Sequence, residues 1–140
     1  MSIGCREIQR GINGILADKG FRVVANEAVE GSKKPCCTVD AVLSSAERLN
    51  DFIEEDTFNA EIIYYPAVET REELIKAAEK LRLLLLYTPI EVDGRVIETY
   101  HIDFEFDDPV LIANVSYTLT QNTPYEEEDF EEMTEIKLNM

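Results

Sequence analysis

The first apolar pattern along the chain has helical spacing. Ile8, Ile12 and Leu16 recur every fourth residue, which predicts an amphipathic helix over residues 2 to about 18. Two glycines interrupt this segment, and each costs about 1 kcal/mol relative to alanine in a helix interior. Either packing of the apolar face stabilises the helix, or a neighbouring element approaches it closely at a glycine. The two positions are Gly11 and Gly14.

A second helix is indicated by its first residues and by its apolar stripe. The segment TREE, residues 70 to 73, matches a capping box, in which Thr70 accepts a hydrogen bond from the backbone N–H of Glu73 and the Glu73 side chain reaches back to Thr70. The helix ends before Pro89, because the residue before a proline disfavours helical dihedrals. Its apolar face is formed by Leu74, Ala77, Ala78, Leu81, Leu84 and Leu85.

Alternating apolar and polar residues predict strands in the first half of the chain. The segment FRVVANEA, residues 21 to 28, is interpreted as a short strand. Residues 44 to 56 are polar and rich in turn formers, so we expect a loop there, and residues 58 to 66 alternate again as a strand. Another strand starts after Pro35 in EGSKKPCCTVDAV and places on one face Cys37, Val39, Ala41 and Leu43.

The second half of the chain predicts a hairpin and two longer strands. Residues 90 to 98 contain Asp93 and Gly94, a pair that tolerates the positive φ values of a type I′ hairpin turn. The segment YHIDFEF, residues 100 to 106, and the segment VLIANVSYTLT, residues 110 to 120, both alternate. The order of elements is therefore helix, three strands, helix, hairpin and two strands.

This order predicts a single α+β domain over residues 1 to 122, with two main helices packed on an antiparallel or mixed β-sheet. Residues 123 to 140 have a different composition. They carry seven acids against one base, Lys137, so we interpret them as an acidic C-terminal tail outside the core.

The whole chain is strongly acidic, with 29 Asp and Glu residues against 13 Lys and Arg residues and a net charge of −16. Nucleic-acid binding depends on basic groups that displace counterions from phosphates, so this charge excludes a DNA-binding role. Charged residues interrupt every apolar run near the N-terminus, and the longest apolar run, residues 83 to 87, is too short to span a bilayer. We expect a soluble protein that is made in the cytoplasm and does not bind membranes.

Three cysteines bear on the redox chemistry of the chain, and two of them, Cys36 and Cys37, are neighbours. The odd number and the adjacent positions argue against a disulfide framework. Neither a CxxC spacing nor a nearby base indicates a redox pair or a nucleophile. We expect all three to be reduced and interpret the adjacent pair as the start of a buried strand.

Two further groups of residues could carry chemistry. His101, Asp103 and Glu105 alternate on one face of a strand and could hold a divalent metal, although a solvated face opposite buried residues explains them better. Lys33 and Lys34 could hold an anion, but no glycine-rich phosphate-binding loop accompanies them. We favour a contact of these lysines with carboxylates, including those of another subunit. The pattern predicts no catalytic residues, no bound metal and no cofactor.

The order of four motifs resembles one protein family. These are the strand start EGSKKPCCTVDAV, the strand FNAEIIYYP, the helix TREELIKAAEKL and the hairpin IEVDGRVI. In this order they resemble the tail terminator proteins of long-tailed phages and prophages of Gram-positive bacteria. The resemblance covers about residues 1 to 121 and leaves the acidic tail outside. Cys36 and Cys37 depart from the family pattern, in which this position is often aromatic.

The resemblance implies a structural virion protein without an active site. Such a subunit forms a hexameric ring on the tail tube, ends tube growth and contacts the head connector, while DNA passes through an acidic lumen. Its location is the host bacterial cytoplasm during assembly and then the head-proximal end of the virion tail. The resemblance leaves open whether the free subunit is a monomer or a ring.

Closed rings use heterologous interfaces, in which one face of a subunit meets a different face of the next. We therefore expect contacts at the exposed loop of residues 44 to 57 and at residues Lys33, Lys34, Asp93, Gly94 and Arg95. Two alternatives stay open. One is another head-tail joining or minor capsid protein, and the other is a metal-dependent enzyme that uses the face of His101, Asp103 and Glu105.

Overall fold

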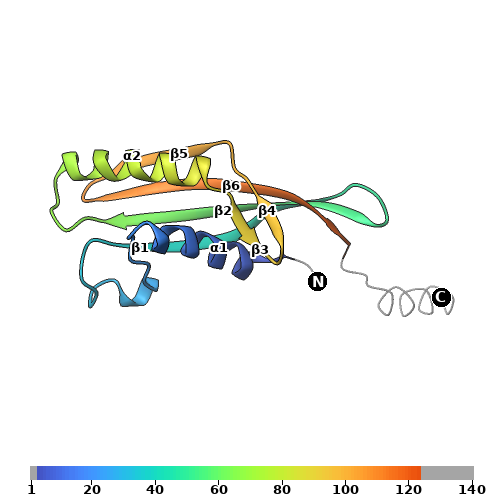
Figure 1. Cartoon of the computed structure of the whole chain (residues 1–140), viewed down its shortest axis with the longest axis horizontal. Helices are drawn as coiled ribbons and strands as arrows, with labels where there is room; N and C mark the ends of the chain where they lie inside the picture. Colours follow the sequence, from blue (N-terminus) through green and yellow to red (C-terminus); the bar gives the residue numbers. More distant parts are fainter. Residues whose placement is uncertain (1–2, 124–140) are drawn as a thin grey trace.

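Two amphipathic helices cover one face of a four-stranded antiparallel sheet, and a small hairpin lies beside one helix (Figure 1). The computed structural model describes residues 3 to 123. This arrangement confirms the α+β class and shows that the main sheet is antiparallel rather than mixed. In chain order the elements are α1 (Cys5–Asp18), the 3-10 helix η1 (Asn26–Ala28), β1 (Cys36–Arg48), β2 (Ile53–Tyr65), α2 (Arg71–Tyr87), β3 (Ile90–Val92), β4 (Arg95–Ile97), β5 (Ile102–Asp107) and β6 (Val110–Asn122).

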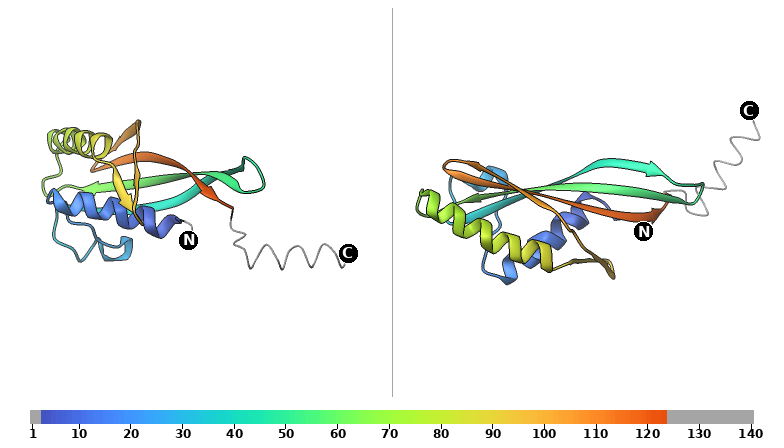
Figure 2. Two further views of the ribbon diagram at one scale, coloured as in Figure 1. Left: turned by 45° about the vertical axis from the view of Figure 1, so that its right-hand side comes forward. Right: turned by 90° about the horizontal axis from the view of Figure 1, so that it is seen from above.

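The main sheet has the order β1-β2-β6-β5, and β3 forms a separate two-stranded sheet with β4. Helix α1 contacts β1, β2 and β3, whereas α2 contacts β5 and β6, so both helices lie on the same side of the sheet (Figure 2). The core lies between this helical layer and the inward-facing strand residues. At its centre, Ala60 of β2 stands opposite Ala41 of β1 and Val115 of β6. No helix in residues 3 to 123 has the length and apolar character needed to cross a bilayer.

Helix α1 confirms the first predicted helix. Its buried stripe is Ile8, Ile12 and Leu16, each fully inaccessible to solvent. The structure also distinguishes the two glycines of this helix. A Cβ atom added at Gly11 would lie 3.1 Å from Ile90 Cβ and 3.1 Å from Val92 Cγ2, so strand β3 approaches the helix closely there. The same atom at Gly14 would meet no heavy atom within 4 Å.

Alanine substitutions at the two glycines should therefore have opposite effects on stability. Gly14→Ala should raise the free energy of unfolding by about 1 kcal/mol, because alanine restricts the unfolded chain and has the higher helix propensity. Gly11→Ala gains the same propensity, but it drives a methyl group against Ile90 and Val92, so we expect a net loss. Urea titration of the two variants checks both signs, and equal stabilisation by both would contradict the close approach of β3.

Helix α2 confirms the second predicted helix and half of its predicted cap. Thr70 Oγ1 accepts a hydrogen bond from the backbone N–H of Glu73 at 3.3 Å. The capping box also predicts that the backbone N–H of Thr70 donates to the Glu73 side chain. In the structure this N–H donates instead to Val68 O at 2.8 Å. The helix buries one face against the sheet through Leu74, Ala77, Leu81, Leu84 and Leu85.

The strand predicted at residues 21 to 28 is wrong. Only a single parallel bridge forms, in which the Val24 N–H donates to Cys37 O at 2.8 Å and the Cys37 N–H donates to Arg22 O at 2.7 Å. The chain then turns into η1, so the pairing cannot continue. This short contact covers the outer edge of β1 where that strand begins.

The loop predicted at residues 44 to 56 is also wrong. Strand β1 continues to Arg48 and β2 begins at Ile53, so only a short turn remains between them. In Figure 1 this hairpin extends beyond both helices at the right-hand end of the molecule. Neither α1 nor α2 covers its side chains, and within the described residues positions 43 to 48 are all exposed, so the apolar alternation that marks a half-buried strand is absent. Backbone pairing with β2, and of β2 with β6, forms the strands instead.

The remaining predicted elements agree with the structure. The turn of the small hairpin has positive φ at Asp93 (48°) and Gly94 (80°), as a type I′ turn requires. In β6 the inward-facing residues are buried, and they are Leu111, Ala113, Val115, Tyr117 and Leu119. The boundary between domain and tail at residue 122 stays a prediction, because residues 124 to 140 lie outside the described residues.

Candidate functional site

The face of the main sheet that lies away from the helices is acidic. Asp40 of β1 stands directly opposite Glu61 of β2, Glu61 opposite Asn114 of β6, and Asn114 opposite Asp103 of β5, which gives one continuous row across all four strands. Each of these four residues is exposed. Farther along, Glu47 and Glu55 form another opposed pair. We call these residues, together with Glu105, the outer acidic face.

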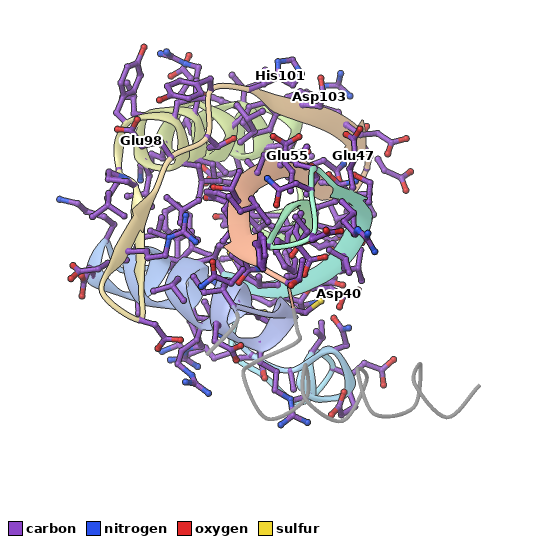
Figure 3. All side chains as sticks on the ribbon, turned by 90° about the vertical axis from the view of Figure 1, so that its right-hand side faces the viewer. Asp40, Glu47, Glu55, Glu98, His101 and Asp103 are labelled. Carbon is purple, nitrogen blue, oxygen red and sulfur yellow. The ribbon has the colours of Figure 1, made fainter. Side chains whose placement is uncertain are left out.

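Basic residues are almost absent from the strands that form this face. Arg48, the last residue of β1, is the only Lys or Arg in β1, β2, β5 and β6, and it is paired with Asp51 at 2.8 Å. Figure 3 shows Asp40, Glu47 and Asp103 projecting from the side of the sheet that faces away from α1. Like charges directly opposite each other on neighbouring strands destabilise a sheet, so the fold carries these carboxylates at a cost in stability.

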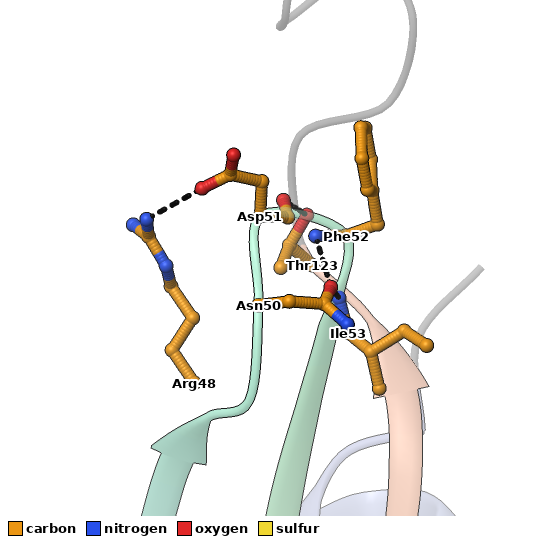
Figure 4. Close-up of polar contacts among 6 residues, drawn as sticks. All are labelled: Arg48, Asn50, Asp51, Phe52, Ile53 and Thr123. Atoms are coloured by element: carbon orange, nitrogen blue, oxygen red, sulfur yellow. Dashed lines mark hydrogen bonds and ion pairs between the residues drawn. The ribbon is translucent and has the colours of Figure 1, made fainter.

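Several polar contacts hold together the turn between β1 and β2, which forms the tip of the long hairpin (Figure 4). Asn50 Oδ1 accepts hydrogen bonds from the backbone N–H groups of Phe52 at 2.7 Å and Ile53 at 2.9 Å. The N–H of Thr123 donates to Phe52 O at 2.9 Å, which fixes the end of β6 to the tip. The tip presents the Phe52 ring to solvent, with 68% of the residue exposed. The contact loop predicted at residues 44 to 57 is thus formed by the ends of β1 and β2 and the short turn between them.

Beneath this end of the sheet lies a buried polar cluster. Gln121 Nε2 donates to Asp56 Oδ2 at 2.7 Å and to Ile3 O at 3.0 Å, while Gln121 Oε1 accepts from the Ile3 N–H at 2.5 Å. Asp56 is 5% exposed and Gln121 is 8% exposed. The second carboxylate oxygen of Asp56 has no partner among residues 3 to 123. One side chain therefore connects the segment before α1 to both β2 and β6.

At the opposite end of the molecule lies a cleft of about 170 Å³, which we call the basic cleft. It lies between the end of α1, the start of β1 and the first half of α2. Four basic residues line it with a single acid, Glu73. Its basic residues are Lys19, Arg22, Lys76 and Lys80, and its floor includes Phe21, Cys36, Cys37 and Tyr64.

The adjacent cysteines belong to the wall of this cleft. Cys36 is 1% exposed and Cys37 is fully buried, as expected for a buried strand start. Burial, reinforced by the neighbouring Cys36, raises the pKa of Cys37 to about 12. This shift favours the protonated thiol near neutral pH.

The structure does not bring the five predicted interface residues together. Lys33 and Lys34 lie exposed on the loop before β1, and Lys34 Nζ lies 5.9 Å from the centroid of the Tyr65 ring. Asp93 and Gly94 form the turn of the β3–β4 hairpin, which packs against α1. Arg95 Nη1 donates to Thr120 O at 2.7 Å, so this side chain holds the hairpin against β6. A role of these residues between subunits stays a prediction.

On the face predicted as an alternative metal site, His101 contacts Asp103. His101 Nε2 lies 3.0 Å from Asp103 Oδ1, and both side chains are more than 70% exposed. In the described part of the chain, no group of three or more His, Cys, Asp or Glu residues is placed to bind a metal.

Sequence reasoning did not predict the basic cleft. Lys76 and Lys80 are four residues apart and share a helix face, whereas Lys19 and Arg22 flank Gly20. These spacings indicate two local pairs of charges. Only the tertiary fold brings the end of α1 close to α2, so that the two pairs of basic residues line one cleft.

Comparisons with known proteins identify a family for this chain. A family model described as phage tail terminator protein matches residues 7 to 129, which confirms the resemblance drawn from the sequence motifs. The match continues into the first residues of the acidic tail, which the resemblance left outside. No curated protein matches the chain. One solved structure aligns with 89% of this chain and 99% of its own length, at 13% identity and a TM-score of 0.40.

Proposed function

Because this chain belongs to the phage tail terminator family, it is a structural component of a phage tail, and we propose that it closes the head-proximal end of the tail tube. Six copies form a ring on the last layer of the tube, stop its growth and offer the opposite face to the head connector. The family match over residues 7 to 129 carries this proposal. The ring assembles in the host bacterial cytoplasm, and its task is geometric rather than catalytic.

The outer acidic face supports an orientation of the subunit within the ring. DNA must pass through the lumen during packaging and ejection, so a wall that repels phosphates prevents retention. The row of Asp40, Glu61 and Asp103 supplies such a wall across the full width of the sheet. We place this face toward the lumen, which leaves the helical layer and both ends of the molecule for contacts with neighbours, tube and connector.

The loop of Lys33 and Lys34 is a candidate contact with a neighbouring subunit, because it presents two exposed positive charges on a molecule with net charge −16. Replacing both lysines by Glu should lower the fraction of tail tubes that carry a ring and leave the thermal unfolding of the subunit unchanged. The matched control is Arg6→Glu with Arg10→Glu, which makes the same charge change on exposed positions of α1. If both double variants leave the same fraction of tail tubes with a ring, Lys33 and Lys34 do not form a specific contact between subunits. The hairpin of Asp93, Gly94 and Arg95 stays a second candidate contact.

Electron microscopy of particles that lack this protein tests the proposed function. A terminator limits tube length, so its loss should give tails of uncontrolled length that carry no heads. The rival function, a head-tail joining or minor capsid protein, predicts tails of normal length that fail to attach to heads. Normal tails in the deletion, restored to heads by adding the purified protein, would overturn the terminator role.

A further inference from the structure

The basic cleft is an electrostatic exception on this molecule. The chain has 29 acids and only 13 bases, yet four of those bases line this one cavity beside a single acid. Lys76 forms only long, solvent-accessible ion pairs, with its ammonium 3.8 Å from the exposed Glu72 and 4.0 Å from the partly exposed Glu73. Lys19, Arg22 and Lys80 form no ion pair with any residue between 3 and 123. Concentrated positive charge of this kind fits an acidic partner.

The chain itself contains a segment of matching chemistry. Residues 124 to 132 read PYEEEDFEE, with six acids, two aromatic residues and no base. The floor of the cleft offers Phe21 and Tyr64, whose rings lie edge to face at a centroid distance of 6.2 Å. Charge on the rim and aromatic surface beneath it thus match the two kinds of side chain in this segment.

Chain geometry excludes the subunit's own segment as the occupant. The cleft includes Tyr64, which stands opposite Leu111 at the start of β6, while the acidic segment follows Thr123 at the other end of that strand (Figure 1). From Leu111 to Thr123 an extended strand spans about 40 Å. Even fully extended, residues up to 132 reach only about 30 Å beyond Thr123. The acids must therefore meet the cleft of a different copy.

We propose that the acidic segment of residues 124 to 132 of one subunit binds in the basic cleft of the next subunit. This inference rests on the proposed ring. Thr123, after which the segment begins, and the cleft lie at opposite ends of the main sheet, so the proposed contact is heterologous and each copy donates once and accepts once, as a closed ring requires. The subunits then associate through opposite charges although each carries a large negative net charge.

A labelled peptide with the sequence of residues 123 to 134 tests this contact on the full-length protein, by fluorescence anisotropy at moderate ionic strength. The native chain should bind the peptide. The double variant Lys19→Glu with Lys80→Glu should bind it at least about tenfold more weakly, because two attractive charges become repulsive. The matched control, Arg10→Glu with Arg82→Glu, changes exposed bases of the same two helices outside the cleft and should stay within about twofold of native binding.

A charge-swapped peptide makes the result independent of any loss of folding in the variants. With Glu126, Glu127 and Glu128 replaced by Lys, the peptide should bind the Lys19→Glu, Lys80→Glu chain more tightly than it binds the native chain. The inference is overturned if the native chain does not bind the original peptide, or if cleft and control variants bind it equally. The terminator role is tested separately, by electron microscopy of tails from the deletion. Tails of uncontrolled length would support that role even if the peptide does not bind.

Discussion

Replacing Gln121 by leucine should lower the free energy of unfolding by about 3 kcal/mol, because it removes the hydrogen-bond donor of a buried carboxylate and leaves that group with its desolvation cost. The Gln121 amide makes three hydrogen bonds, to Asp56 Oδ2, to the Ile3 carbonyl and from the Ile3 N–H. Leucine has a similar volume but offers no polar atom. The Asp56 carboxylate, already without a partner for one oxygen among residues 3 to 123, would lose its donor while it stays buried.

Two variants separate this polar network from the general effect of a leucine substitution. Gln9→Leu removes the other glutamine of the chain, whose single described bond, from the Ala41 N–H, is 3.4 Å long and only partly buried, so its cost should stay below about 1 kcal/mol. Asp56→Asn keeps an oxygen for Gln121 and removes the buried charge. Adding it to Gln121→Leu should restore at least about 1 kcal/mol, because no carboxylate is then left buried.

Urea denaturation of the three single variants and the double variant measures these differences directly. A Gln121→Leu chain as stable as Gln9→Leu would mean that the buried network contributes little. No recovery in the double variant would mean that the charge of Asp56 is not the cause of the loss. In the first case an apolar side chain could replace Gln121 between β2, β6 and the segment before α1, and in the second the loss would arise from its two hydrogen bonds to Ile3.

Gln121 also illustrates what the sequence could reveal about this fold. Its inward position follows from the alternation of Tyr117 and Leu119 in β6, so the face of the residue could be predicted. Its partners could not, because Ile3 and Asp56 lie far away in the chain. Short-range signals, such as the Thr70 cap and the Asp93-Gly94 turn, identified elements correctly because their physics is contained within a few residues.

The wrong or missing predictions concern features that depend on contacts between distant parts of the chain. Beyond Leu43 neither α1 nor α2 covers β1, so hydrophobic alternation disappears although the strand continues to Arg48. The run of apolar residues around Val23 has the pattern of a strand, but it forms only one bridge before the chain turns away. The basic cleft depends on contacts among three elements that are separate in sequence. In each case tertiary surroundings, rather than local pattern, decided the outcome.

Reversing the outer acidic face should convert a ring that releases DNA into one that retains it. The variant Asp40→Lys, Glu61→Lys and Asp103→Lys replaces three exposed carboxylates of one row across the sheet. If this row lines the lumen, each ring gains basic groups around the DNA path, and retention of linear double-stranded DNA should rise by at least about tenfold through counterion release. The neutral set Asp40→Asn, Glu61→Gln and Asp103→Asn should raise retention far less.

The shape of the DNA distinguishes a lumen from an outer surface. A closed circle cannot thread a closed ring, so a lumen-facing lysine row should retain linear DNA and not circular DNA of equal length. A control with Glu79→Lys, Glu91→Lys and Glu98→Lys places the same charges on exposed positions of α2, the small hairpin and the segment after it, and Figure 3 shows Glu98 on the other side of the molecule from Asp40. Filter binding with rings assembled on tail tubes makes the comparison. Equal retention of both DNA forms by the Asp40, Glu61, Asp103 variant would place its row on the outside of the ring, because only surface charge binds a circle as well as a linear molecule.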